Sequence, residues 1–163
     1  MKQKKNRPLL LAGAICLLSL VAMVLALTLG GKDTVTPFTP PPFDETAQVG
    51  TPEVPENLGW GELDAKVFKA SVCGVFAPSD GKVDVYLTNP ETNTVWLKLR
   101  VLDTNGNILG ETGLVKPGEY VQSVTLTTTP KTGAKIVLKL MAYEPETYHS
   151  AGAVSLETTV SES

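Results

Sequence analysis

Apolar and polar residues alternate along most of the chain after residue 60, and this period of two constrains the fold more than any other feature. In one clear run, Val95, Leu97, Leu99 and Val101 occupy every second position. Such alternation places one set of side chains on each face of a β-strand. No helical period follows residue 31. The C-terminal part of the chain is therefore predicted to be all-β.

Turn-forming residues separate the alternating runs. Asn105-Gly106 is a strong hairpin signal, because both residues accept positive φ. The turns delimit seven predicted strands, near residues 66–77, 82–89, 94–103, 108–114, 119–127, 134–143 and 152–160. Seven short antiparallel strands in about 100 residues predict an immunoglobulin-like or fibronectin III-like sandwich. A small barrel is the alternative.

An apolar segment without a charged residue lies near the N-terminus, at residues 9–30. As a helix of about 1.5 Å per residue, the twenty-one residues 9–29 are roughly 31 Å long, which suffices to cross the hydrocarbon core of a bilayer. Residues 1–8 carry four basic residues and no acid, and basic residues before such a span stay in the cytoplasm. The sequence predicts a cytoplasmic tail at 1–8, a transmembrane signal anchor at 9–30 and an extracytoplasmic remainder.

A cleaved signal peptide, which would release a secreted protein, is the alternative for this segment. Val24 and Ala26 stand at the two positions that a signal peptidase inspects. The apolar run is longer than the roughly 7–15 residues usual in signal peptides, which favours a retained anchor. Cys16 lies mid-segment and follows Ile15, where a lipoprotein motif needs a small residue, so we interpret it as an ordinary apolar residue of the helix.

Residues 31–58 form a proline-rich, acidic predicted linker ahead of a domain at 59–163. Proline lacks a backbone donor and fixes φ, so we expect neither a helix nor a central strand there. Dense prolines favour polyproline II, at about 3.1 Å per residue, which predicts a partly stiff stalk. A tether of no set length is the alternative. Phe38 and Phe43 flank the proline cluster and are candidate docking residues.

Charge and cysteine content exclude some classes of partner and cross-link. Residues 1–31 carry a formal charge of +4, whereas the remaining 132 residues carry −7. An acidic exported part without basic clusters argues against a nucleic-acid partner. Cys16 is assigned to the membrane segment and Cys73 to the domain, so no internal disulfide is expected and the domain must stand on its core.

No residue pattern indicates an enzyme, a cofactor or a metal site. His149 is the only histidine, and no serine or cysteine lies in a nucleophile motif. The segment from Asp103 to Asn107 superficially resembles a calcium loop, but its glycine stands at the fourth position instead of the sixth. A hairpin turn explains these five residues.

The longest predicted loop, Glu144 to Gly152, is the candidate partner-binding site. Glu144, Glu146, Tyr148 and His149 supply two acids, an aromatic ring and the sole histidine, groups that can anchor and orient a ligand. Loops at the ends of a sandwich carry function because the sheets hold them rigidly. The alternative is an ordinary strand connection with Tyr148 packed over the end of the sandwich.

Part of the chain resembles small membrane-tethered or secreted β-sandwich proteins of Gram-positive bacteria. The resemblance lies in three segments: LTNPETN at 87–93, DTNGNIL at 103–109 and LVKPGEYVQSVTL at 114–126. These segments consist largely of turns. The resemblance implies the fold and the compartment, and it implies no activity.

These features predict a single-pass membrane protein with an extracytoplasmic β-sandwich that serves as a non-catalytic binding or structural module of the cell envelope. An envelope protein or a glycan is the expected partner. The alternative function is an envelope carbohydrate-binding module that uses Trp96, Tyr86 or Tyr143. That alternative requires the three aromatic rings to form one flat, exposed platform.

Overall fold

The computed structural model describes Met23 and residues 38–162. The chain divides into two compact units, Met1–Thr39 and Pro40–Ser163. Among the described residues, no helix is both long enough and apolar enough to cross a membrane. The predicted tail at 1–8 and anchor at 9–30 lie outside the described residues, apart from Met23.

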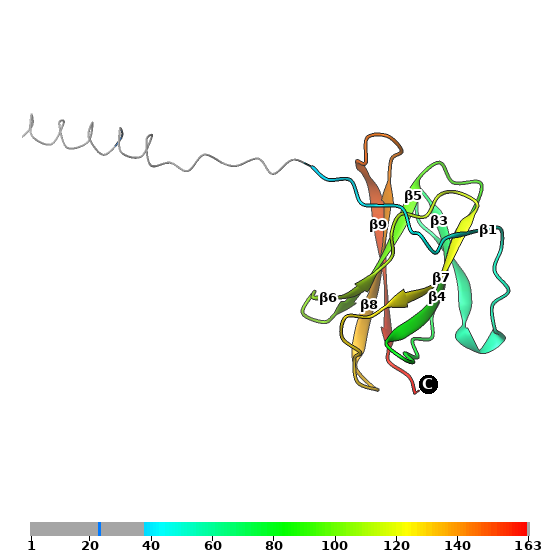
Figure 1. Ribbon diagram of the computed structural model, residues 1–163, viewed down its shortest axis with the longest axis vertical. Helices are drawn as coiled ribbons and strands as arrows, with labels where there is room; N and C mark the ends of the chain where they lie inside the picture. Colours follow the sequence, from blue (N-terminus) through cyan, green and yellow to red (C-terminus); the bar gives the residue numbers. More distant parts are fainter. Residues whose placement is uncertain (1–22, 24–37, 163) are drawn as a thin grey trace, which may run out of the picture. The chain divides into compact units, whose positions relative to one another are not determined.

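The second unit is built from two antiparallel sheets (Figure 1). The five-stranded sheet has the order β1 (Gln48–Val49), β7 (Glu119–Thr125), β4 (Lys82–Asn89), β3 (Lys69–Cys73), β2 (Trp60–Asp64). The four-stranded sheet has the order β6 (Ile108–Glu111), β5 (Trp96–Asp103), β8 (Lys135–Tyr143), β9 (Ser150–Thr159). A short 3-10 helix, η1 (Glu56–Leu58), precedes β2. The predicted all-β sandwich is confirmed, and the barrel alternative is wrong because the two sheets remain separate.

The core lies between the two sheets and follows the alternation of the sequence. Leu97, Leu99 and Val101 of β5 have no exposed surface. Val85 and Leu87 of β4 belong to the same buried cluster from the opposite sheet. Apolar surface removed from water contributes roughly 25 cal/mol per Å², so these facing rows supply the main stabilisation of the fold.

The prediction of seven strands is too low, although all seven predicted strands are present. β2 pairs with β3 from Trp60 opposite Cys73 to Asp64 opposite Lys69. Its sequence, WGELD, has no apolar alternation and is mostly exposed. An edge strand of this kind is held through backbone hydrogen bonds, which leave no pattern of side chains in the sequence.

The folded unit begins at Pro40, well before the boundary predicted at residue 59. The Asp44 N–H donates to Leu114 O, and the Leu114 N–H donates to Pro42 O, both at 2.9 Å. Further on, β1 pairs with β7. The prolines do not prevent these contacts, because Pro42 takes part only as an acceptor through its carbonyl oxygen. Of the predicted linker, only residues 31–39 therefore precede the sandwich unit. We call residues 40–44 the strap.

One buried amide ties the end of β4 to the opposite sheet. Asn89 has no exposed surface, and its Nδ2 donates to Val95 O and to Val115 O, both at 2.9 Å. Its Oδ1 accepts a hydrogen bond of 2.7 Å from Asn93 Nδ2. A buried polar side chain with all its partners present stabilises a single arrangement, since any other leaves polar groups unpaired.

Candidate functional site

Three aromatic side chains from separate parts of the chain meet at one end of the four-stranded sheet. They are Phe43, Trp96 and Tyr148, which we call the aromatic cluster. The ring centroids of Phe43 and Trp96 are 4.8 Å apart at an interplanar angle of 77°, and those of Trp96 and Tyr148 are 5.2 Å apart at 60°. Edge-to-face and tilted contacts of this kind are favourable beyond the area they bury. Trp96 is the centre of the cluster.

The strap positions Phe43 against the sheet. The Gly113 N–H donates to Asp44 Oδ2 at 2.7 Å, in addition to the two backbone bonds between the strap and Leu114. The Lys116 ammonium lies 4.6 Å from the centroid of the Phe43 ring, which is a cation–π distance. Phe43, one of the two candidate docking residues of the linker, therefore packs within its own domain.

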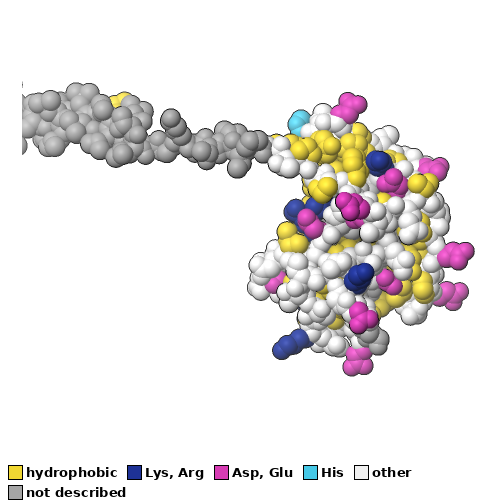
Figure 2. Space-filling view, in the orientation of Figure 1, with side chains coloured by type: hydrophobic (Ala, Val, Ile, Leu, Met, Phe, Trp, Pro, Cys, Tyr) yellow, Lys and Arg dark blue, Asp and Glu magenta, His cyan; other side chains and the backbone are white. Residues whose placement is uncertain are grey.

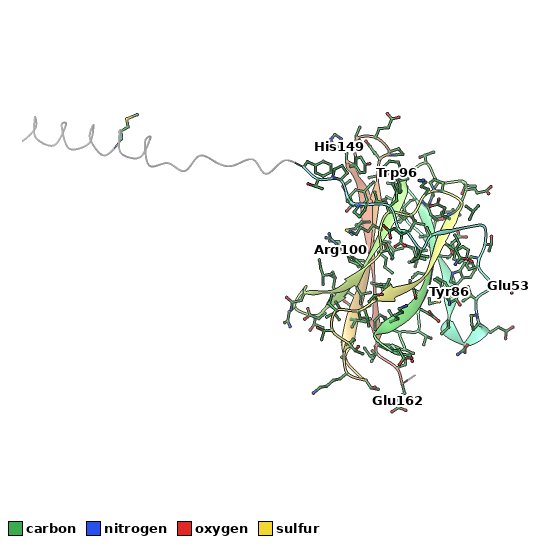
Figure 3. The ribbon with its side chains drawn as sticks, viewed as in Figure 1. Glu53, Tyr86, Trp96, Arg100, His149 and Glu162 are labelled. Carbon is green, nitrogen blue, oxygen red and sulfur yellow. The ribbon has the colours of Figure 1, made fainter. Side chains whose placement is uncertain are left out.

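The predicted partner-binding loop forms a tight turn between β8 and β9. The Glu144 N–H donates to His149 O at 2.9 Å, and the Tyr148 N–H donates to Glu144 O at 3.0 Å. Tyr148 is half-buried against Trp96, whereas Glu144, Glu146 and His149 are exposed. Tyr148 therefore packs over the end of the sandwich, as expected for an ordinary strand connection. His149 lies at the same end as Trp96 (Figure 3).

The surface around this turn is rich in apolar side chains. In Figure 2 the sole histidine stands beside a group of hydrophobic side chains at one end of the sandwich. Phe43 is 37% exposed. The sequence pointed to Tyr148 but did not indicate that this ring contacts Trp96, or that Trp96 contacts Phe43. The only sequence signal for that contact was the aromatic residue that closes the proline cluster.

The three aromatic residues proposed for carbohydrate binding do not form one platform. Trp96 and Tyr143 are directly opposite each other on β5 and β8, so their side chains share a face. Tyr86 belongs to β4 of the other sheet and is 8% exposed. It sits at a bulge with a φ of 43° and lies away from Trp96 (Figure 3). The platform that the alternative function requires is therefore missing.

A buried lysine lies one step along β5 from the aromatic cluster. Lys98 is 5% exposed, and its Nζ donates to Glu111 Oε1 at 2.8 Å. Arg100 Nε donates to Glu111 Oε2, also at 2.8 Å. Burial raises the pKa of Glu111, but the hydrogen bonds from Lys98 and Arg100 outweigh it and hold that pKa below its ordinary value. The carboxylate is therefore ionised at neutral pH.

The Asp103 carboxylate is used inside the hairpin turn between β5 and β6. Its Oδ1 accepts hydrogen bonds of 2.8 Å from the N–H groups of Asn105 and Asn107, and its Oδ2 accepts one of 2.8 Å from Asn107 Nδ2. These bonds, with that from the Asn107 side chain strongest, hold the pKa of Asp103 below its ordinary value. Among the described residues, no group of three or more His, Cys, Asp or Glu side chains is placed to hold a metal ion.

Cys73 is a structural side chain. It is 1% exposed, and burial raises the pKa of its thiol to about 11, with a further contribution from the Asp84 carboxylate. The thiol is protonated at neutral pH, and a protonated thiol is a poor nucleophile.

The close approach of the strap to Gly113 leads to a mutational prediction. A Cβ at position 113 would lie 2.5 Å from Asp44 Cα and 2.7 Å from the Phe43 carbonyl carbon, both backbone atoms. We expect Gly113→Ala to displace the strap and to lower the free energy of unfolding by roughly 1–3 kcal/mol. Limited proteolysis within residues 40–47 measures the displacement, and urea unfolding measures the loss of stability.

Gly61→Ala is the matched control, because a Cβ at that position meets no atom within 4 Å. The control should be cut no faster than the native chain. Equal resistance of both variants to protease would contradict the assigned role of the strap.

Comparison with known proteins identifies no family for this chain. No protein family matches the chain, and no curated protein sequence matches it. Among solved structures, the chain is similar to CopC from Methylosinus trichosporium OB3b. The two share 18% sequence identity over 63% of this chain and 94% of that chain, with a TM-score of 0.37. At this level of similarity no residue role passes from that protein to this one.

Proposed function

We propose that the protein is a single-pass, extracytoplasmic module of the cell envelope that binds or supports another component without catalysis. Two features support the membrane placement: the uncharged segment at 9–30 and the basic tail at 1–8. A β-sandwich with its own core is a suitable outer domain for such an anchor. The N-terminus is then cytoplasmic, and the sandwich faces outward.

The observation that carries the binding role is the aromatic cluster with the strained turn that borders it. Glu146 and Tyr148 have φ angles of 66° and 57°, in the left-handed region that favours glycine. Non-glycine residues in this region cost free energy, and such strain gathers at functional sites. The turn accepts this strain and delivers Tyr148 to the cluster. We therefore assign the contact surface of the module to this end of the sandwich.

The carbohydrate-binding alternative has less support. Sugar rings stack on flat, exposed aromatic faces, but Trp96 is met by Phe43 at 77° and by Tyr148 at 60°. Tyr86 is buried in the other sheet. A cluster of inclined rings suits an irregular apolar partner better than a pyranose ring.

Topology is tested by labelling single introduced cysteines with a membrane-impermeant maleimide. Thr104 is exposed in the β5–β6 turn, so we expect Thr104→Cys to be labelled in intact cells. Lys4→Cys is the matched control in the basic tail and should be labelled only after permeabilisation. The native Cys73 is buried and should give little background.

The outcomes separate the two interpretations of the N-terminal segment. Retention of the Lys4→Cys label on the full-length chain in the membrane fraction supports an anchor. A Thr104→Cys protein found in the medium without its N-terminal segment would instead show a cleaved signal peptide. Labelling of Lys4→Cys before permeabilisation would contradict the proposed orientation.

A further inference from the structure

The outer face of the four-stranded sheet, the face turned away from the core, carries both aromatic and cationic side chains. Trp96 stands opposite Tyr143, and Lys98 stands opposite Met141 in the next outward-facing pair. Arg100 then stands opposite Lys139. Like charges directly opposite each other destabilise a sheet. Glu111 on the neighbouring strand β6 pairs with Arg100 and offsets this cost in part.

The charge of this outer face is opposite to that of the rest of the domain. Residues 40–163 carry nine Lys/Arg and sixteen Asp/Glu, a formal charge of −7. The outer-facing positions of the sheet carry four cations and two acids: Lys98, Arg100, Lys135, Lys139, Glu111 and Glu157. Both acceptor oxygens of Glu111 are used by Lys98 and Arg100. In the part of the chain that the structure describes, Lys135 and Lys139 have no ion pair. The formal charges at these positions sum to +2. Lys98 is buried, so the accessible positive charge of the face comes from Arg100, Lys135 and Lys139. The face is therefore weakly cationic on an acidic protein.

Tryptophan and tyrosine beside lysine and arginine suit the interface between lipid and water. Their rings have one apolar end and one polar end, and they gather at the level of the headgroups, where cations meet the lipid phosphates. The rings of the aromatic cluster are inclined to one another by 77° and 60°, which suits insertion among headgroups better than stacking on a sugar. Glu144 and Glu146 are exposed in the turn beside the cluster, so attraction to anionic lipid comes from the outer face of the sheet and not from the turn. The cluster supplies the apolar part of the contact.

The length of chain before the strap keeps the sandwich near the bilayer. If the predicted anchor ends at residue 30, residues 31–39 span at most about 35 Å when fully extended. A compact domain the length of Pro40–Ser163 has a radius of gyration of about 14 Å, which corresponds to a diameter of about 35 Å. The tether is therefore no longer than the diameter of the domain. A short tether gives an effective concentration of order mM, at which even a weak affinity for the surface holds the domain down. Phe43 of the strap, a few residues after this tether in the sequence, packs against Trp96.

We propose that the aromatic cluster and the cationic outer face dock the sandwich onto the surface of the membrane that anchors it. The lipid headgroup layer is then the partner of the contact surface assigned above, and anionic lipid strengthens the contact. This inference rests on the proposed function, because it needs the anchor at 9–30. The domain lies along the membrane instead of standing off it on a stalk.

The two tryptophans of the chain provide a test in the full-length protein. Trp96 belongs to the aromatic cluster, whereas Trp60 belongs to β2 of the other sheet. Trp60→Phe leaves Trp96 as the sole emitter, and Trp96→Phe leaves Trp60. Each variant is reconstituted into vesicles of phosphatidylcholine and phosphatidylglycerol that contain lipids brominated near the headgroup. We expect Trp96 emission to be quenched at least about twofold more than that of Trp60, as for a ring at the interface.

Charge reversal provides the matched control in the Trp60→Phe background. Lys135→Glu with Lys139→Glu should reduce the quenching of Trp96, and so should vesicles of phosphatidylcholine alone. Lys66→Glu with Lys82→Glu changes the net charge equally, outside the outer face, and should leave the quenching unchanged. Equal effects of the two pairs would overturn the proposal.

Flotation of the vesicles separates the two levels of the hypothesis. A chain that fails to float overturns the proposed anchor and the docking with it. A chain that floats while Trp96 is quenched no more than Trp60 overturns the docking alone. Trp96 emission that responds to a soluble acidic polysaccharide but not to the brominated lipids would assign the face to a glycan and overturn the proposal.

Discussion

Leu99→Ala is expected to lower the free energy of unfolding by about 2–5 kcal/mol, the range found for leucines in packed cores. Leu99 has no exposed surface and lies in the middle of β5, with Leu140 of β8 directly opposite it. Removing its side chain leaves a cavity between the two sheets. Backbone hydrogen bonds within each sheet limit how far the sheets can move to fill it. Urea unfolding followed by circular dichroism measures the change.

Leu102→Ala is the matched control, since the same atoms are removed from the same strand. Leu102 is half-buried and faces outward, so the expected loss is roughly 1 kcal/mol or less. A similar loss from both substitutions would mean that the alternation of β5 does not sort the core from the surface. That outcome would contradict the assigned packing of the sandwich.

Glu111→Gln is expected to cost roughly 2 kcal/mol at neutral pH, because it leaves the buried Lys98 ammonium without its carboxylate. The Lys98 side chain is 6% exposed and that of Glu111 is 38% exposed, so water screens part of the interaction. Glu62→Gln is the control. Glu62 forms an ion pair of 2.9 Å with Lys69, and the side chains of Lys69 and Glu62 are 49% and 57% exposed. Water screens an exposed pair of this kind, so the control should change the free energy of unfolding little.

The contribution of Glu111 to the free energy of unfolding decreases as the pH falls. Its pKa in the folded chain lies below the ordinary value of 4.5, so the native protein binds this proton less tightly than the unfolded chain. The stabilisation is complete above that ordinary value and is lost as the pH falls through the lowered pKa. The difference between native protein and Glu111→Gln should therefore shrink from pH 7 to pH 3. A constant difference would show that the substitution acts through packing and not through charge.

The alternating pattern of the sequence determined the sandwich and the location of its principal strands. The side-chain period of a strand is two, so Val95, Leu97, Leu99 and Val101 can be buried together only in an extended chain. Turn residues such as Asn105 and Gly106 then separated one strand from the next, because they accept backbone angles that other residues avoid. These signals are local, and local signals can be read along the sequence.

The tertiary structure alone decided which distant segments meet. Phe43 reaches Trp96 because the strap pairs with Leu114, and Tyr148 reaches the same ring because its turn closes between β8 and β9. Asn89 looks like a turn residue in the sequence, but it is a buried amide that joins Val95 to Val115. The edge strand β2 and the strap are both paired through backbone hydrogen bonds. Every residue except proline offers the same backbone donor and acceptor. Contacts made by the backbone leave little trace in the order of the side chains, so their partners appear only when the chain is folded.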